Sequence, residues 1–123
     1  MSNHFELLKE NYLISTDTAR LNVDVIYQYL SEESYWAKEI PRSVVEQSIA
    51  NSLCFGVYYN NEQIGFARVI TDYATFGYLA DVFIIESARG NGLSKWLMEC
   101  ILMHPQLQGL RNFCLMTQDA HTL

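Results

Sequence analysis

The chain has 123 residues, of which 50% are hydrophobic and 18% charged, and its formal net charge at pH 7 is −6. This length predicts one domain, residues 1–123, and this apolar content excludes a wholly disordered chain. An acidic chain lacks the positive surface of a general nucleic-acid or anionic-membrane binder, and no apolar run reaches the roughly 20 residues of a membrane span.

The three cysteines, Cys54, Cys100 and Cys114, are widely spaced and lie in apolar runs. They form neither a Cys-x-x-Cys pair nor a Cys/His ligand spacing, so we expect buried free thiols without a metal site or a disulfide framework. The first residues have no basic and apolar regions of a secretory signal. Together these features predict a cytoplasmic protein.

The first half of the chain predicts one strand and two helices. The strand is expected at residues 12–16, and Asp17 begins a polar segment that can cap a helix. Apolar residues then recur at helical spacing on one face: Val23, Ile26, Tyr27 and Leu30. Ser43 and Glu46 have the spacing of a capping box, which predicts a second helix that ends near residue 51.

The second half predicts a strand hairpin, a third strand, a helix and a last strand. The hairpin strands are residues 54–59 and 64–70, joined by a turn at residues 60–63. A continuous apolar run over residues 78–85 is typical of a strand covered on both faces. Leu93, Trp96, Leu97 and Ile101 then mark an amphipathic helix, and a final strand covers residues 112–116. The order β-α-α-β-β-β-α-β predicts a three-layer α+β domain.

Two glycines, Gly90 and Gly92, lie in the loop that joins the third of these strands to the following helix. Backbone N–H groups of such a turn, together with the helix start, can form a concave site for phosphate oxygens. Glycine lets the backbone approach the anion and adopt positive φ. Arg89 and Lys95 add positive charge beside the turn. An ordinary strand-to-helix turn needs the same glycines, so both interpretations stay open from the glycines alone.

The segment Arg89-Gly90-Asn91-Gly92-Leu93-Ser94, with the preceding strand pattern Leu79-x-x-Val82-x-Ile84, resembles motif A of the GNAT acetyltransferase superfamily, Gln/Arg-x-x-Gly-x-Gly/Ala. Ser94 stands where the family has glycine or alanine. The element order also resembles the family's core over nearly the whole chain. The resemblance implies a GNAT fold with a central, mostly antiparallel sheet, and acetyl-CoA as co-substrate without a metal.

The resemblance also implies which residues hold the cofactor. The backbone of Val82, Phe83 and Ile84 would pair with the pantetheine arm, and one of its N–H groups would face the thioester carbonyl. The pyrophosphate would lie against a second group of residues: Arg89, Gly90, Asn91, Gly92, Leu93, Ser94 and Lys95. Thr117 stands where the family commonly has an asparagine that follows the last predicted strand.

By the same resemblance, the protein would transfer an acetyl group to a primary amine by direct attack in a ternary complex. The acceptor, a small-molecule amine ahead of a protein amine, would lie near Tyr35, Trp36 and Tyr73. Asp81 is a lone carboxylate in an apolar strand, where burial would raise its pKa, so it is the candidate general base. A solvated or capping role for Asp81, or a water chain as the base, are the alternatives.

The family commonly continues with Asn-x-x-Ala-x-x-x-Tyr, whereas residues 117–123 end one position before that tyrosine. On this pattern we expect a fold without the family's last helix and two strands. Residues 112–116 would then be an uncovered edge, which favours a homodimer through this strand. Alternative functions are a non-catalytic acyl-CoA-binding or interaction module and a generic phosphate or nucleotide binder.

Overall fold

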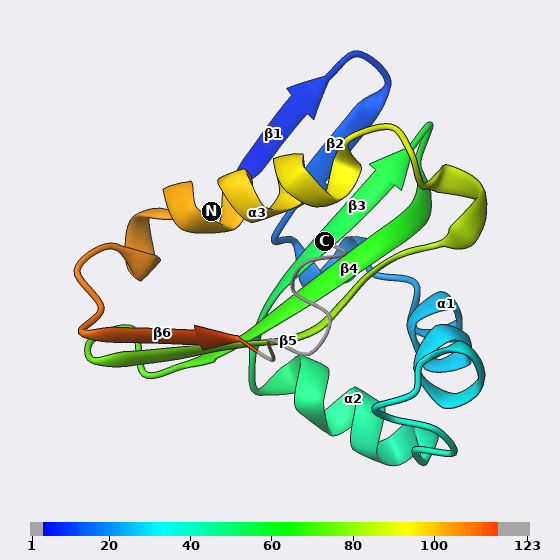
Figure 1. Ribbon diagram of the computed structural model, residues 1–123, viewed down its shortest axis with the longest axis horizontal. Helices are drawn as coiled ribbons and strands as arrows, with labels where there is room; N and C mark the ends of the chain where they lie inside the picture. The colour runs from blue at the N-terminus through cyan, green and yellow to red at the C-terminus, as the bar shows by residue number, and fades with distance from the viewer. Residues whose placement is uncertain (1–3, 116–123) are drawn as a thin grey trace.

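A computed structural model describes residues 4–115 of the chain. Six strands form one sheet in the order in which they occur along the chain: β1 (Glu6–Lys9), β2 (Tyr12–Ser15), β3 (Leu53–Tyr59), β4 (Glu62–Thr71), β5 (Phe76–Ile84) and β6 (Asn112–Leu115). Every neighbouring pair is antiparallel except β5 and β6, which run parallel (Figure 1). The predicted mostly antiparallel sheet is therefore confirmed.

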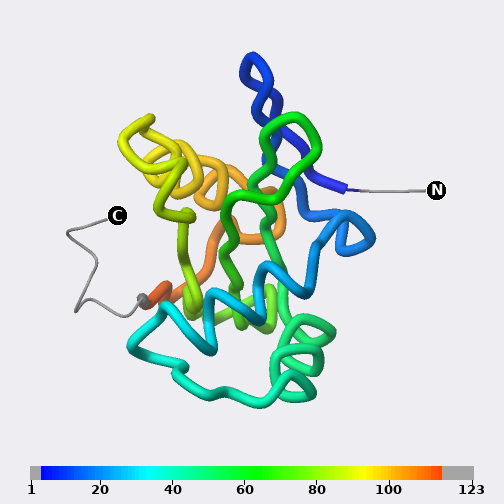
Figure 2. Tube along the Cα trace, turned by 90° about the vertical axis from the view of Figure 1, so that its right-hand side faces the viewer, coloured from blue at the N-terminus to red at the C-terminus, as the bar shows by residue number. Residues whose placement is uncertain are grey.

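Helices cover both faces of this sheet (Figures 1 and 2). The helical elements are a 3-10 helix (Thr18–Arg20), α1 (Val23–Gln28), a π-helical turn (Tyr29–Glu33), α2 (Arg42–Ala50), a 3-10 helix (Glu86–Ala88), α3 (Leu93–Met103) and a 3-10 helix (Pro105–Leu107). One core lies between the sheet and α3, and a second lies between the sheet and α1 and α2. This is the predicted three-layer arrangement.

The helices begin at residues that differ partly from the prediction. Asp17 caps the short 3-10 helix, and Asn22 caps α1 with its side-chain oxygen. α2 begins at Arg42 without a side-chain cap, so Ser43 is already helical. Glu46 accepts a hydrogen bond from Arg42 Nε at 3.1 Å. The predicted capping box of Ser43 and Glu46 is therefore wrong, because the helix starts two residues earlier than a cap at Ser43 requires and Glu46 pairs with a different residue.

Strand β1 was not expected from the sequence. Its two adjacent leucines, Leu7 and Leu8, break the alternation of apolar and polar residues that marks a half-buried strand. In the structure Leu8 lies on the edge strand of the sheet with 78% of its surface exposed. The β3–β4 turn is shorter than predicted, since β4 already begins at Glu62. Asn60 and Asn61 have φ of 49° and 71°, which is the pair of positive values that a two-residue type I′ hairpin turn requires.

The expectation of a buried free thiol is confirmed for two of the three cysteines. Cys54 and Cys100 are buried free thiols, but Cys114 is exposed. The expectation for Cys114 is wrong because successive strand residues face opposite sides, and its neighbour Phe113 is the one that packs against the α3 core. Across residues 4–115, no three His, Cys, Asp or Glu side chains gather as metal ligands. None of the helices in this range combines the length and apolarity needed to cross a membrane.

Candidate functional site

β5 contains a bulge in its second half. The pairing register between β4 and β5 shifts between Ala80 and Phe83, where Asp81 and Val82 stand opposite a single residue of β4. Asp81 has φ of 54°, in the left-handed region. A bulge of this kind bends the strand and changes the direction of its backbone groups. The structure therefore places a backbone irregularity at Asp81 and Val82, where the segment expected to meet the thioester, residues 82–84, begins.

The same part of β5 has an open edge. In the described part of the chain, β6 pairs in parallel with β5 over the four positions from Phe76 to Leu79. Within residues 4–115, positions 80–84 have no partner strand on that side. Unpaired backbone N–H and C=O groups along a strand edge can bind an extended molecule as a further strand would.

The turn that follows β5 has the features of an anion site. Gly90 and Gly92 have φ of 86° and 74°, and a Cβ placed on either would meet no atom within 4 Å. Trp96 donates its N–H to the Gly92 carbonyl at 3.1 Å. Among the described residues, the N–H groups from Gly90 to Lys95 have no recorded acceptor, as expected for a helix start. With the exposed Lys95 beside them, these groups fit a diphosphate.

The Arg89 side chain is directed back into the protein. Its Nε donates to the Ile84 carbonyl at 2.9 Å, and its Nη2 donates to Tyr29 Oη at 2.8 Å. The ring of Tyr29 in turn stacks on Phe83, with ring centroids 4.0 Å apart. Arg89 therefore links the end of β5 to the helical layer. Tyr29 was missed by the sequence reasoning, and no local pattern indicates a contact between residues so far apart in the chain.

Asp81 has two partners, whereas the sequence suggested a lone carboxylate. Trp36 Nε1 donates to Oδ1 and Arg68 Nε donates to Oδ2, both at 2.9 Å. Arg68 Nη1 also donates to Ser52 Oγ at 3.0 Å. The Arg68 and Asp81 side chains are only 15% and 11% exposed. Arg68 could have been found, because opposite charges on two neighbouring apolar strands favour a cross-strand pair. A general-base role for Asp81 stays a prediction.

The predicted acceptor residues are only partly brought together. Trp36 lies at the bulge through its bond to Asp81, and Tyr35 packs edge-on against Trp36 with ring centroids 5.3 Å apart. Tyr73 lies in the exposed β4–β5 turn, before β5 begins at Phe76. At about 3.3 Å per residue, the start of β5 is roughly 17 Å from the bulge. The structure thus groups Tyr35 and Trp36 without Tyr73, and Thr117 lies outside the described residues.

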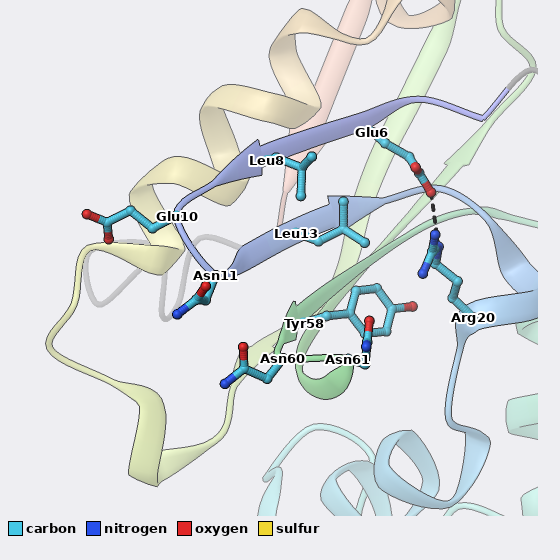
Figure 3. Close-up of a pocket in the computed structure, with 9 residues that line it drawn as sticks. All are labelled: Glu6, Leu8, Glu10, Asn11, Leu13, Arg20, Tyr58, Asn60 and Asn61. Atoms are coloured by element: carbon cyan, nitrogen blue, oxygen red, sulfur yellow. Dashed lines mark hydrogen bonds and ion pairs between the residues drawn. The ribbon is translucent and has the colours of Figure 1, made fainter.

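A separate groove of about 350 Å³ lies between the β1–β2 hairpin and the β3–β4 turn (Figure 3). Its lining residues are Glu6, Leu8, Glu10, Asn11, Leu13, Arg20, Tyr58, Asn60 and Asn61. Arg20 Nε is paired with Glu6 at 3.1 Å, and Tyr58 Oη is buried without a hydrogen-bond partner in the described part of the chain. β4 lies between the strands of this groove and β5, so the groove is distinct from the bulge and the glycine turn.

Comparisons with known proteins agree with this geometry. The family model described as "Acetyltransferase (GNAT) family" matches residues 23–121. A Gibberella zeae protein assigned to the acetyltransferases is 35% identical in an alignment that covers 89% of this chain and 73% of that protein. The crystal structure of a GNAT-family protein from Xanthomonas campestris pv. campestris is 50% identical, with a TM-score of 0.87 over 90% of this chain and 78% of that one.

A more distant structure shows the same fold with its ligand. It is a GNAT family acetyltransferase from Elizabethkingia anophelis with acetyl-CoA bound, 18% identical, with a TM-score of 0.56 over 76% of this chain and 57% of that one. The family match covers most of the chain, the two closer relatives align over nine-tenths of it, and the fold is the one the motif implied. The chain therefore belongs to the GNAT family of acetyltransferases.

Proposed function

We propose that the protein transfers an acetyl group from acetyl-CoA to a primary amine by direct attack in a ternary complex. The observation that carries this proposal concerns the described residues, 4–115: the edge of β5 beside its bulge has no partner strand there, and the N–H groups of the turn that follows have no acceptor among them. A long molecule with an amide-containing arm and a diphosphate matches these two features in that order.

In this proposal, the backbone of residues 82–84 pairs with the pantetheine arm, and the N–H groups of residues 90–95 hold the pyrophosphate. The exposed Lys95 adds a positive charge to this second contact. Arg89 contributes by holding the end of β5 through the Ile84 carbonyl. When bound, acetyl-CoA supplies an acetyl group activated as a thioester, and the protein supplies binding and orientation. The acetyl-CoA-bound relative supports this choice of donor.

The transfer requires a deprotonated amine, because an ammonium nitrogen has no lone pair. The nitrogen attacks the thioester carbonyl carbon, so that the C–N bond forms, the C–S bond breaks and the sulfur leaves as a thiolate. The nitrogen loses one proton to become the neutral amide, and the thiolate takes up one proton to become the CoA thiol. A backbone N–H at the bulge would donate to the carbonyl oxygen as it gains negative charge. One well-placed donor of this kind is worth roughly 3–4 kcal/mol.

The cysteines support direct attack over an acetyl-cysteine route. Burial raises the pKa of the Cys54 thiol to about 12 and that of Cys100 to about 11. At neutral pH both are therefore protonated, and the thiol is a much weaker nucleophile than the thiolate. Cys114 lies on β6 opposite Tyr78, away from the bulge.

The acceptor is proposed to be a small-molecule amine that enters beside Tyr35 and Trp36, with a protein amine as the second choice. The test combines calorimetry with CoA and a thiol-release assay with acetyl-CoA and a panel of polyamines, amino acids, arylamines and lysine peptides. We expect CoA to bind and one amine class to release thiol. Binding without turnover would favour the non-catalytic acyl-CoA module, and absence of CoA binding would contradict both.

A further inference from the structure

The charged cluster at the bulge is built from three separate parts of the chain. Arg68 comes from β4, Asp81 from β5, and Trp36 from the loop before α2. Both oxygens of the Asp81 carboxylate accept a hydrogen bond at 2.9 Å, one from each partner. Arg68 is held in turn by Ser52 Oγ. The carboxylate is thus fixed from two sides in a site that is almost closed to solvent.

Asp81 also has an unusual backbone conformation within the bulge. Its φ of 54° is a conformation that residues other than glycine rarely adopt, although aspartate tolerates it better than most. A backbone of this kind persists only where the surrounding structure fixes it. The two hydrogen bonds to the carboxylate supply that constraint, because they hold the side chain on the α1/α2 face while the strand bends.

The bulge determines where the following residues point. The register shift occurs immediately before Phe83 and Ile84, and a one-residue change of register reverses the face to which each strand residue is directed. If Asp81 returned to an extended conformation, the backbone groups of residues 82–84 would no longer be presented at the open edge. The position of the N–H that would face the thioester is therefore linked to the Asp81 side chain.

We propose that Arg68, together with Trp36, is a positioning residue for acetyl transfer, which holds the β5 bulge by fixing the Asp81 carboxylate. The inference rests on the proposed function, since the bulge matters for catalysis only if the thioester lies there. It gives Trp36 a role at the bulge in addition to any contact with the acceptor. In this arrangement Asp81 is an anchor for the backbone, and another group or water removes the proton from the amine.

The first test compares two double variants, Arg68→Met with Asp81→Gly and Arg68→Met with Asp81→Ala. Both remove the ion pair without leaving one charge buried alone. Glycine adopts positive φ freely, whereas alanine does not. If the pair serves to hold the bulge, the glycine variant should keep about tenfold more kcat than the alanine variant, with similar KM for acetyl-CoA. Equal kcat values would overturn the proposal.

The second test separates an anchor from a general base. Asp81→Asn keeps an acceptor for one partner and tolerates positive φ, but it does not titrate. We expect kcat within about tenfold of the wild type and an unchanged shape of the pH profile, measured with the amine identified by the thiol-release panel. Loss of the low-pH limb of that profile would assign Asp81 as the base and overturn the anchor role.

The third test needs no turnover, so it remains decisive if no amine is accepted. Arg68→Met should move the backbone amide NMR signals of residues 82–84 and weaken CoA binding in calorimetry. The matched control is Arg42→Met, which removes the exposed pairs of Arg42 with Asp24 and Glu46 and should leave both readouts unchanged. Unmoved amide signals in a folded Arg68→Met protein would contradict the proposal, while failure of CoA to bind the wild type would contradict the proposed function instead.

Discussion

At the scale of single residues, Gly92 tests the proposed anion site. An alanine there would place a methyl group in the open space beside the N–H groups of the glycine turn and would strain a φ of 74°. We expect Gly92→Ala to weaken CoA binding by about tenfold or more, which is about 1.4 kcal/mol or more in binding free energy. Isothermal calorimetry with CoA measures this change directly.

Gly109 provides the matched control for this prediction. It has a φ of 78° and equally open surroundings, but it lies in the loop before β6. Gly109→Ala should therefore carry the same backbone strain, on the order of 1–2 kcal/mol, without an effect on CoA affinity. An equal loss of affinity in both variants would mean that the glycines act only through stability.

A second prediction at this scale concerns two buried tyrosine hydroxyls. Tyr58 Oη has no partner in the described part of the chain, whereas Tyr29 Oη accepts a hydrogen bond from Arg89. Tyr58→Phe should therefore leave the free energy of unfolding unchanged or raise it. Tyr29→Phe should lower it by about 1–3 kcal/mol, because a charged donor loses its acceptor. Urea unfolding of both variants gives the comparison, and a larger loss for Tyr58→Phe would contradict it.

At the scale of elements, the junction between α3 and the following 3-10 helix predicts a pH dependence. His104 Nδ1 accepts the N–H of Gln106 at 3.1 Å, and burial lowers the pKa of this imidazole below its usual 6.5. In the folded protein the His104 imidazole thus stays neutral at a pH at which the same imidazole is already protonated in the unfolded chain. This contribution to stability is complete above about pH 6.5 and is lost as the pH falls below it.

The measurement is urea unfolding at about pH 7.5 and about pH 5 for the wild type and for His104→Asn. The asparagine side chain can accept the same N–H but does not titrate. We expect the wild type to lose more unfolding free energy than the variant over this range. Parallel losses would show that His104 makes no contribution to the pH dependence.

The helices and strands that could be predicted from the sequence are those marked by a pattern within a few neighbouring residues. The strands after residue 53 and the glycine turn were predicted closely, because apolar runs and paired asparagines or glycines act within a few residues. β1 was missed because Leu8 lies exposed on an edge strand. The start of α2 was misplaced because the Arg42–Glu46 pair took the place of the expected cap.

In the candidate site, too, residues marked by a local pattern could be predicted and contacts between distant residues could not. Gly90 and Gly92 could be assigned from their spacing, since a turn of this kind needs positive φ within a short segment. The contact between Trp36 and Asp81 spans 45 residues, and that between Tyr29 and Arg89 spans 60. Such contacts exist only after α1 and the loop before α2 have packed on the sheet, so no pattern along the chain indicates them.

At the scale of the whole molecule, CoA should stabilise the fold by joining β5 to the start of α3. A ligand that binds only the native state at about 100 times its Kd adds about 2.7 kcal/mol. For a domain of this size, that corresponds to a rise in Tm of roughly 10 °C. Thermal unfolding with and without CoA measures the shift, and Gly92→Ala should reduce it. No rise at saturating CoA would contradict the proposed donor site.

Within residues 4–115, β6 pairs with β5 as far as Leu79, and in the proposed function the part of β5 beyond this point would separate two kinds of recognition. Main-chain atoms line the proposed donor side, and every residue type except proline offers the same N–H and C=O there. Exposed side chains such as that of Tyr35 border the other side. Mutational drift at the surface can thus alter which amine is accepted while the choice of acyl carrier stays constant. If the proposed function holds, descendants of this chain could change the amine that they accept without losing the acyl carrier.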